Sequence, residues 1–144
     1  MKILVVNGPN LNLIGTREPD IYGTDTYADL TQLVAKTCGE QGVDFEMFQS
    51  NHEGALVDKI QLAYGTCDGI VINAAAYTHT SIAILDALKA VNLPTVEVHL
   101  SDLSTREAFR QLSFVELAAE KTVMGQGIAG YAEAICYLTD RFSV

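Results

Sequence analysis

The chain has 144 residues and a formal net charge of −9, with 18 acidic side chains against nine Lys and Arg. This acidity argues against binding to nucleic acid or to an anionic membrane surface, because both select basic proteins. The length fits a single domain, residues 1–144, and a hydrophobic share of 49% is too high for intrinsic disorder. Because only 19% of residues are charged, the surface has room for an apolar subunit interface.

The three cysteines are widely spaced and lie in apolar surroundings, and no pair of them has the spacing of zinc ligands. We therefore expect free thiols in a reducing, cytoplasmic compartment. The apolar run at residues 3–6 is too short for the core of a signal peptide. No stretch approaches the roughly 20 apolar residues of a membrane-spanning helix.

Short apolar runs alternate with helical periods along the chain. The predicted strands lie, in chain order, at residues 3–6, 43–48, 69–72, 94–98 and 122–124. The predicted helices between and after them lie at residues 27–38, 53–64, 81–91 and about 128–138. Thr26 and Asp29 form a capping box for the first of these helices. Ser104 and Glu107 have the same spacing and predict a further short helix.

Continuous apolar strands separated by helices are typical of a parallel sheet that is covered on both faces. Five strands in this alternation predict an α/β, flavodoxin-like, doubly wound sheet with the strand order 2-1-3-4-5. Ligands bind such sheets beyond the carboxyl ends of the strands. Residues 8–24 follow the first strand without a helix or strand period and exceed the usual length of a βα loop. We expect this segment to be a lid over the site.

All three histidines, His52, His79 and His99, lie in segments that follow predicted strands or end them, among amides and hydroxyls. This gathering at the ligand-binding edge predicts a site for a polar small molecule. The glycine patterns of phosphate and dinucleotide loops are absent, and no Lys lies in these segments to form a Schiff base. The acidic residues do not cluster with the histidines, so a metal site is not predicted.

The predicted lid contains Arg17 and Tyr22. A phenol is a poor base at neutral pH, but a neighbouring guanidinium favours its ionised form. The spacing leaves open whether Arg17 activates Tyr22 or pairs with an acidic neighbour. The helix at 81–91 is apolar almost all round, which indicates burial on more than one side. Asp86 on this helix therefore either serves a subunit contact or is exposed beside Lys89.

Five blocks of the sequence resemble the type II 3-dehydroquinate dehydratases and occur in that family's order. They are NGPNLNLIGTREPDIYG at 7–23, QSNHEG at 49–54, NAAAYTHTSIAILDAL at 73–88, PTVEVHLSD at 94–102 and REAFR at 106–110. The resemblance implies a cytoplasmic hydro-lyase that converts 3-dehydroquinate to 3-dehydroshikimate without a metal or organic cofactor. It also implies a dodecamer built from trimers, and a role in either aromatic biosynthesis or quinate breakdown.

The resemblance assigns catalytic roles to five residues. Tyr22 removes the proton next to the substrate ketone, and Arg17 keeps that tyrosine ionised. His99 protonates the departing hydroxyl and is oriented by Glu97. Asn12 holds a water molecule against the enolate oxygen.

Six further residues are implied to bind substrate, namely Asn73, His79, Asp86, Leu100, Ser101 and Arg110. Asn73, His79 and Arg110 grip the hydroxyls. Leu100, through its backbone N–H, and Ser101 hold the carboxylate. Asp86 reaches a neighbouring site across a subunit contact.

The chain departs from the family's common pattern without losing a catalytic group. Ala74 and Ala75 stand where Pro-Gly is common, Leu85 replaces an arginine, and Asp102 replaces an asparagine. An alternative interpretation is a flavodoxin-like module that binds a small polyol acid without converting it. Such a module needs neither a base nor an acid.

Overall fold

The structure is a computed structural model that describes residues 1–16 and 18–143. Within these ranges, five parallel strands form one sheet in the order β2-β1-β3-β4-β5, which confirms the predicted topology. The strands are β1 (Lys2–Asn7), β2 (Asp44–Gln49), β3 (Gly69–Asn73), β4 (Thr95–His99) and β5 (Lys121–Met124). The α-helices are α1 (Pro19–Tyr22), α2 (Tyr27–Gln41), α3 (Glu53–Leu62), α4 (Ile82–Val91) and α5 (Ala129–Phe142).

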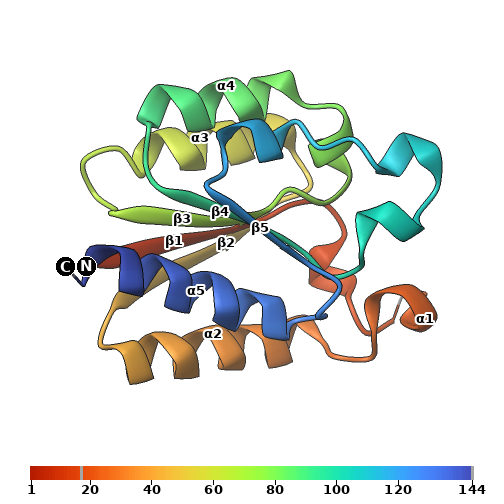
Figure 1. Ribbon diagram of the computed structural model, residues 1–144, viewed down its shortest axis with the longest axis horizontal. Helices are drawn as coiled ribbons and strands as arrows, with labels where there is room; N and C mark the ends of the chain where they lie inside the picture. Colours follow the sequence, from red (N-terminus) through yellow and green to blue (C-terminus); the bar gives the residue numbers. More distant parts are fainter. Residues whose placement is uncertain (17, 144) are drawn as a thin grey trace.

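Helices cover both faces of the sheet, with α2 and α5 on one side and α3 and α4 on the other (Figure 1). Alternate residues of a strand point to opposite faces. Accordingly, Ile3 and Val5 belong to the apolar cluster under α2 and α5, while Leu4 and Val6 belong to the cluster under α3 and α4. This double burial explains why the central strands are uninterrupted apolar runs. Among the described residues, no helix has the length and apolarity needed to cross a bilayer.

The two predicted capping boxes have different outcomes. Thr26 and Asp29 cap α2 in both directions, as predicted. The helix predicted from Ser104 and Glu107 is wrong, since that segment forms the 3-10 turns η3 (Leu103–Thr105) and η4 (Ala108–Arg110). Asp102 accepts hydrogen bonds from both the backbone N–H and the hydroxyl of Ser104. Asp102 is therefore the cap of η3, and Ser104 lies inside this turn in place of the predicted N-cap position.

The segment predicted as a lid has more local structure than its pattern indicated. It contains the 3-10 turn η1 (Leu11–Leu13) and the single-turn helix α1, each too short to show a period. Pro19 occupies the first helical position, where its missing N–H costs nothing. In Figure 1, α1 lies on the same side of the molecule as the turns that follow β4. Arg17 lies outside the described residues.

Strand register aligns polar residues at one edge of the sheet. Asn7 at the end of β1 is level with Gln49 on β2 and with Asn73 on β3. The chain leaves β1 and β3 in opposite directions at this point, which is the switch point of the fold. The Gly8 N–H donates to the Asn73 carbonyl oxygen at 2.8 Å, so the two loops meet backbone to backbone.

We predict that Gly8→Ala destabilises the protein, because the two loops have no room for a side chain. An added Cβ would lie 2.6 Å from the carbonyl carbon of Ala74 and closer still to its oxygen. Overpacking of this kind costs about 1–3 kcal/mol in the free energy of unfolding, which urea denaturation measures.

Gly39→Ala is the matched control, since its Cβ would meet nothing within 4 Å on helix α2. This change should stabilise by up to about 1 kcal/mol through helix propensity. Equal stability of the two variants would contradict the close approach of the loops.

Candidate active site

A cavity of about 290 Å³ opens at the carboxyl edge of the sheet, a size suited to a small molecule. The loops after β1, β3 and β4 line it together with α1. Seven of the predicted site residues lie in its wall, namely Tyr22, Asn73, His79, His99, Leu100, Ser101 and Arg110. Residues from positions 22 to 110 of the sequence therefore meet in one cavity.

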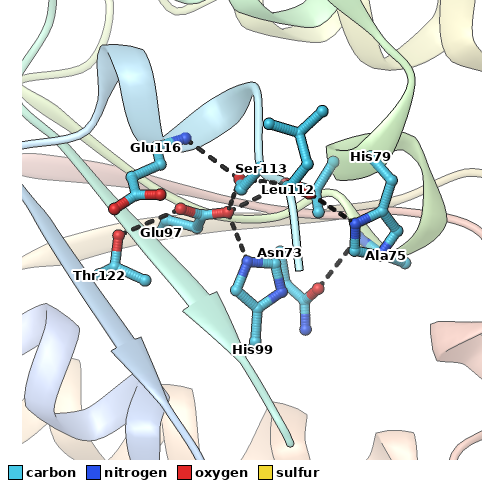
Figure 2. Close-up of polar contacts among 10 residues, drawn as sticks. Asn73, Ala75, His79, Glu97, His99, Leu112, Ser113, Glu116 and Thr122 are labelled. Atoms are coloured by element: carbon cyan, nitrogen blue, oxygen red, sulfur yellow. Dashed lines mark hydrogen bonds and ion pairs between the residues drawn. The ribbon is translucent and has the colours of Figure 1, made fainter. Parts of the chain in front are cut away.

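His99 ends β4 and is backed by a buried carboxylate. Its Nε2 hydrogen-bonds Oε1 of Glu97, a residue with no solvent exposure (Figure 2). Burial raises the pKa of Glu97, but the hydrogen bond and charge of His99 and the hydroxyls of Ser113 and Thr78 lower it, and the net direction is downward. An ionised Glu97 accepts a hydrogen bond from the Nε2–H of His99, which leaves Nδ1 as the ring nitrogen that can exchange a proton with a molecule in the cavity.

Asn73 and His79 form another part of the wall, and Asn73 is drawn between the two histidines in Figure 2. The Nδ1 atom of His79 lies 2.7 Å from the carbonyl oxygen of Leu112. Because a carbonyl only accepts, Nδ1 carries the proton, and Nε2 of a neutral ring is an acceptor. The Asn73 side-chain oxygen accepts from the Ala75 N–H at 3.1 Å, which fixes the orientation of its amide.

Tyr22 contacts Arg106, a residue that sequence reasoning missed. The Nη1 and Nη2 atoms of Arg106 both donate to the Tyr22 hydroxyl at 3.3 Å, and the guanidinium lies 5.3 Å from the ring centroid. Nη1 also donates to the Ser101 hydroxyl at 3.2 Å. Arg106 thus places a guanidinium at the Tyr22 hydroxyl, a position for which the sequence had suggested only Arg17.

Arg110 adds a second guanidinium to the cavity wall. Its buried Nε has no hydrogen bond among the described residues, although the Glu107 carboxylate lies 3.3 Å away. The same carboxylate lies 3.6 Å from Nε of Arg106. One exposed acid therefore stands between two cations, and the cavity wall keeps an excess of positive charge over carboxylates. This arrangement suits a small anion.

The chain that forms this cavity is similar to one family of known proteins. The family model described as "Dehydroquinase class II" matches residues 1–139. A 3-dehydroquinate dehydratase of Corynebacterium glutamicum is 51% identical over 96% of both chains, and one of a Jannaschia species is 53% identical over 96% of this chain and 93% of that one. The type II dehydroquinase structure from Butyrivibrio crossotus has a TM-score of 0.94 at 49% identity, covering 96% of this chain and 97% of that one.

The chain belongs to the class II dehydroquinase family. The family resemblance inferred from the five sequence blocks is confirmed. So is the interpretation of the chain as an enzyme, a hydro-lyase, because the family consists of such enzymes. The comparisons match almost the whole chain, so the family assignment covers every element that lines the cavity.

Three of the predicted site residues are described but are not part of the cavity wall. Glu97 lies behind His99 and hydrogen-bonds its Nε2. Asn12 is exposed on η1, and its side-chain oxygen accepts from Gln49 at 3.3 Å. Asp86 lies on the exposed face of α4 with Ile82, which is 55% exposed. Arg17 lies outside the described residues.

Among the described residues, no group of three His, Cys, Asp or Glu side chains could hold a metal ion. His52, the third histidine at the sheet edge, precedes α3 and is exposed outside the cavity wall. Its position after a strand was therefore not a sign of a shared site. Arg106 belongs to the quoted block 106–110, but its spacing there gives no sign of its contact with Tyr22.

The loop between Asn73 and His79 carries backbone strain. Ala75 has φ of +52°, a left-handed conformation that glycine adopts freely and that costs a residue with a Cβ. By the family resemblance, glycine is common at this position, and Ala75 adopts the same kind of conformation at an energetic cost. The Ala75 N–H bonds Asn73, and the strained residue thus helps to orient a residue of the wall.

We predict that Ala75→Gly stabilises the protein by about 0.5–1 kcal/mol. Relief of left-handed strain gains roughly 1–2 kcal/mol, and the added flexibility of the unfolded chain removes about 0.4–1 kcal/mol of it. Thermal and urea unfolding measure the change.

Ala76→Gly is the control for this loop, because Ala76 lies beside it without a positive φ. That change should only destabilise. If both substitutions destabilise equally, the strain at Ala75 is absent.

Proposed function

We propose that this chain dehydrates 3-dehydroquinate to 3-dehydroshikimate by anti elimination through an enolate. The observation that carries the proposal is that a tyrosine hydroxyl bonded by a guanidinium and a histidine bonded by a buried carboxylate line one cavity. These are a base and an acid, which is what the removal of water requires. The identity of the substrate is inferred from the relatives named 3-dehydroquinate dehydratase.

In the proposed first step, ionised Tyr22 takes a proton from the carbon next to the ketone. The electrons of the broken C–H bond move onto the ketone oxygen and form an enolate. Arg106 stabilises the tyrosinate through its two N–H groups, and by family resemblance Arg17 contributes to the same task. Asn12 holds a water molecule against the enolate oxygen, where a fixed donor stabilises the developing charge.

In the second step, the enolate electrons form the new C=C bond and the C1 hydroxyl departs. His99 gives this hydroxyl a proton, so that water leaves in place of hydroxide. Glu97 holds the opposite ring nitrogen and stabilises the imidazolium before the transfer. The proton that Tyr22 gained then passes to solvent, and His99 takes one up, which restores the starting state.

The proposed binding contacts use the rest of the wall. Asn73, His79 and Arg110 hold the substrate hydroxyls, and Ser101 with the Leu100 backbone N–H holds the carboxylate. Arg106 donates to the Ser101 hydroxyl and adds positive charge close to that carboxylate. Residues 8–24 act as the lid that carries Tyr22 to this substrate, within one catalytic domain of residues 1–144.

The proposal includes assembly into a dodecamer built from trimers, in the cytoplasm. Asp86 is the residue that such a contact would use, because it lies on an exposed face of α4 and outside the cavity of its own chain. Its neighbour Ile82 is a large exposed apolar side chain that a second subunit could cover.

Incubation with 3-dehydroquinate should produce the conjugated enone of the product. Its ultraviolet absorbance measures the rate of formation. Tyr22→Phe should lower kcat by at least about 100-fold, the usual range for loss of a general base, with binding of a substrate analogue retained. Tyr64→Phe is the control, because Tyr64 is 72% exposed outside the cavity. An unmodified chain that binds the analogue without forming enone would instead be a binding module.

Mixing two inactive variants tests the contribution of Asp86 across a contact. Asp86→Ala and Tyr22→Phe chains, dissociated and reassembled together, should regain activity, since some mixed sites have both residues intact. Asp58→Ala, on the exposed face of α3, is the control and should be active alone. Light scattering should give the mass of a dodecamer, and a monomeric mass would refute the assembly.

A further inference from the structure

We propose that Thr122 on β5 is a positioning residue for the His99–Glu97 pair, holding the carboxylate oxygen that His99 does not touch. Its hydroxyl fixes the rotation of the carboxylate and keeps it ionised, so that the other oxygen faces His99. This inference rests on the proposed function, which makes His99 the acid of the reaction. It assigns a task to a residue that is not part of the cavity wall.

The two oxygens of the Glu97 carboxylate have unequal partners. Oε1 accepts from His99 Nε2, from the Ser113 hydroxyl and from the Thr78 hydroxyl, the last at 3.0 Å. Among the described residues, Oε2 accepts a side-chain hydrogen bond from Thr122 alone, at 3.1 Å. Figure 2 shows Thr122 on the side of the carboxylate opposite Ser113. Loss of the Thr122 hydroxyl therefore removes the described side-chain donor to Oε2. Loss of the Thr78 or the Ser113 hydroxyl leaves Oε1 with other donors.

Strand register places Thr122 at this oxygen. β4 and β5 are parallel, and Glu97 is paired with Thr122 in their ladder. Val96 and Val98 belong to the cluster under α2 and α5, so Glu97 between them points to the other face. Thr122, level with Glu97 on the neighbouring strand, points to that face as well. The contact follows from the backbone, and a β-branched residue keeps it in place.

The hydroxyls on Oε1 form a redundant pair. Thr78 and Ser113 lie 2.8 Å from each other as well as close to Glu97, and either can be the donor between them. Ser113 also accepts from the Glu116 N–H at 3.2 Å. Since each hydroxyl has one proton, either Thr78 or Ser113 can serve Oε1 when the other is removed. Thr122 has no such substitute in the described structure.

Burial makes the hydroxyl of Thr122 matter. Glu97 has no solvent exposure, so an oxygen that loses its donor has no access to bulk water. Burial raises the pKa of Glu97, but His99, Ser113 and Thr78 together lower it by more, so the net direction is downward. Removing the donor to Oε2 weakens the charged form and moves this pKa upward. Protonated Glu97 would no longer hold the Nε2 proton of His99.

The other titratable side chains near Glu97 have different partners. His79 on the 3-10 turn η2 (Ala75–His79) bonds the Leu112 carbonyl, and Lys121 on β5 pairs with Glu133 at 3.2 Å. Glu116 on the 3-10 turn η5 (Val115–Ala118) is exposed. His99 is therefore the side chain that reports on Glu97. A change in the pH dependence of its ring resonances can be assigned to the carboxylate.

The test compares Thr122→Val with the unmodified enzyme in the rate of enone formation across pH. Val keeps the branched shape and removes the hydroxyl. We expect kcat to fall about tenfold, the cost of a lost hydrogen bond to a charged group, with KM changed less than about twofold. The acid limb of the kcat profile should move to higher pH by about one unit. Thr122→Ser should restore both the rate and the profile.

Thr95→Val is the matched control. Thr95 is a buried threonine on β4 whose hydroxyl donates to the Leu93 carbonyl and not to Glu97. Loss of the Thr95 hydroxyl should leave the pH of the acid limb of the kcat profile unchanged. An unmoved limb in Thr122→Val, or an equal shift in both valine variants, overturns the inference. So does a lower kcat with an unchanged profile, because that outcome indicates structural damage alone.

A second measurement separates this inference from the proposed function. The ring resonances of His99, identified by their loss in His99→Gln, are followed by NMR during a pH titration without substrate. The inflection from Glu97 should move upward in Thr122→Val and stay unmoved in Thr122→Ser. If the unmodified enzyme forms no enone, the proposed function fails while this titration still decides the role of Thr122. If Thr122→Val does not fold, Thr122→Cys, a weaker donor, must show a smaller shift of the same sign.

Discussion

Burial of both faces of the central strands determines where this protein can perform chemistry. Residues on β1 and β3 alternate between two apolar clusters, one under α2 and α5 and the other under α3 and α4. Polar groups within these layers are costly, so they gather where the strands end. The parallel register then brings Asn7, Gln49 and Asn73 level at one edge, and a glycine lets the loops after β1 and β3 touch. The cavity lined by polar side chains accordingly forms at this edge.

Glu97 is an exception that shows the same constraint. It lies inside a strand, between two valines of the core, and its carboxylate has no solvent exposure. Such a charge is stable only when donors replace the lost water. Hydroxyls from η2, β5 and the segment before η5 supply them together with His99. A His–Glu pair inside the sheet thus requires supporting residues from elements that are remote in sequence.

The elements and the sheet order were predictable because hydrophobic period and strand burial are properties of neighbouring residues. The cavity wall was predictable because carboxyl ends of parallel strands must meet, as Asn73 and His99 do. The failures have a different physical origin. Asp102 caps a 3-10 turn that contains Ser104, so Ser104 is not at the start of the predicted helix. The contact of Arg106 with Tyr22 depends on two consecutive 3-10 turns and on α1, none of which has a period. Side-chain partners across unrelated loops leave no signature in spacing.

Net charge and local charge can have opposite signs in one small domain. The chain has nine more acidic than basic side chains, yet Arg106, Arg110, His79 and His99 line a cavity whose wall contains no Asp or Glu among the described residues. Field lines in a concave, partly apolar site are focused, so nearby cations outweigh distant carboxylates that salt and water screen. Glu107 bridges the two arginines from the exposed side and leaves their Nη groups to the cavity or to Tyr22 and Ser101. A globally acidic enzyme can therefore select an anionic substrate, because attraction is set within a few ångströms of the site.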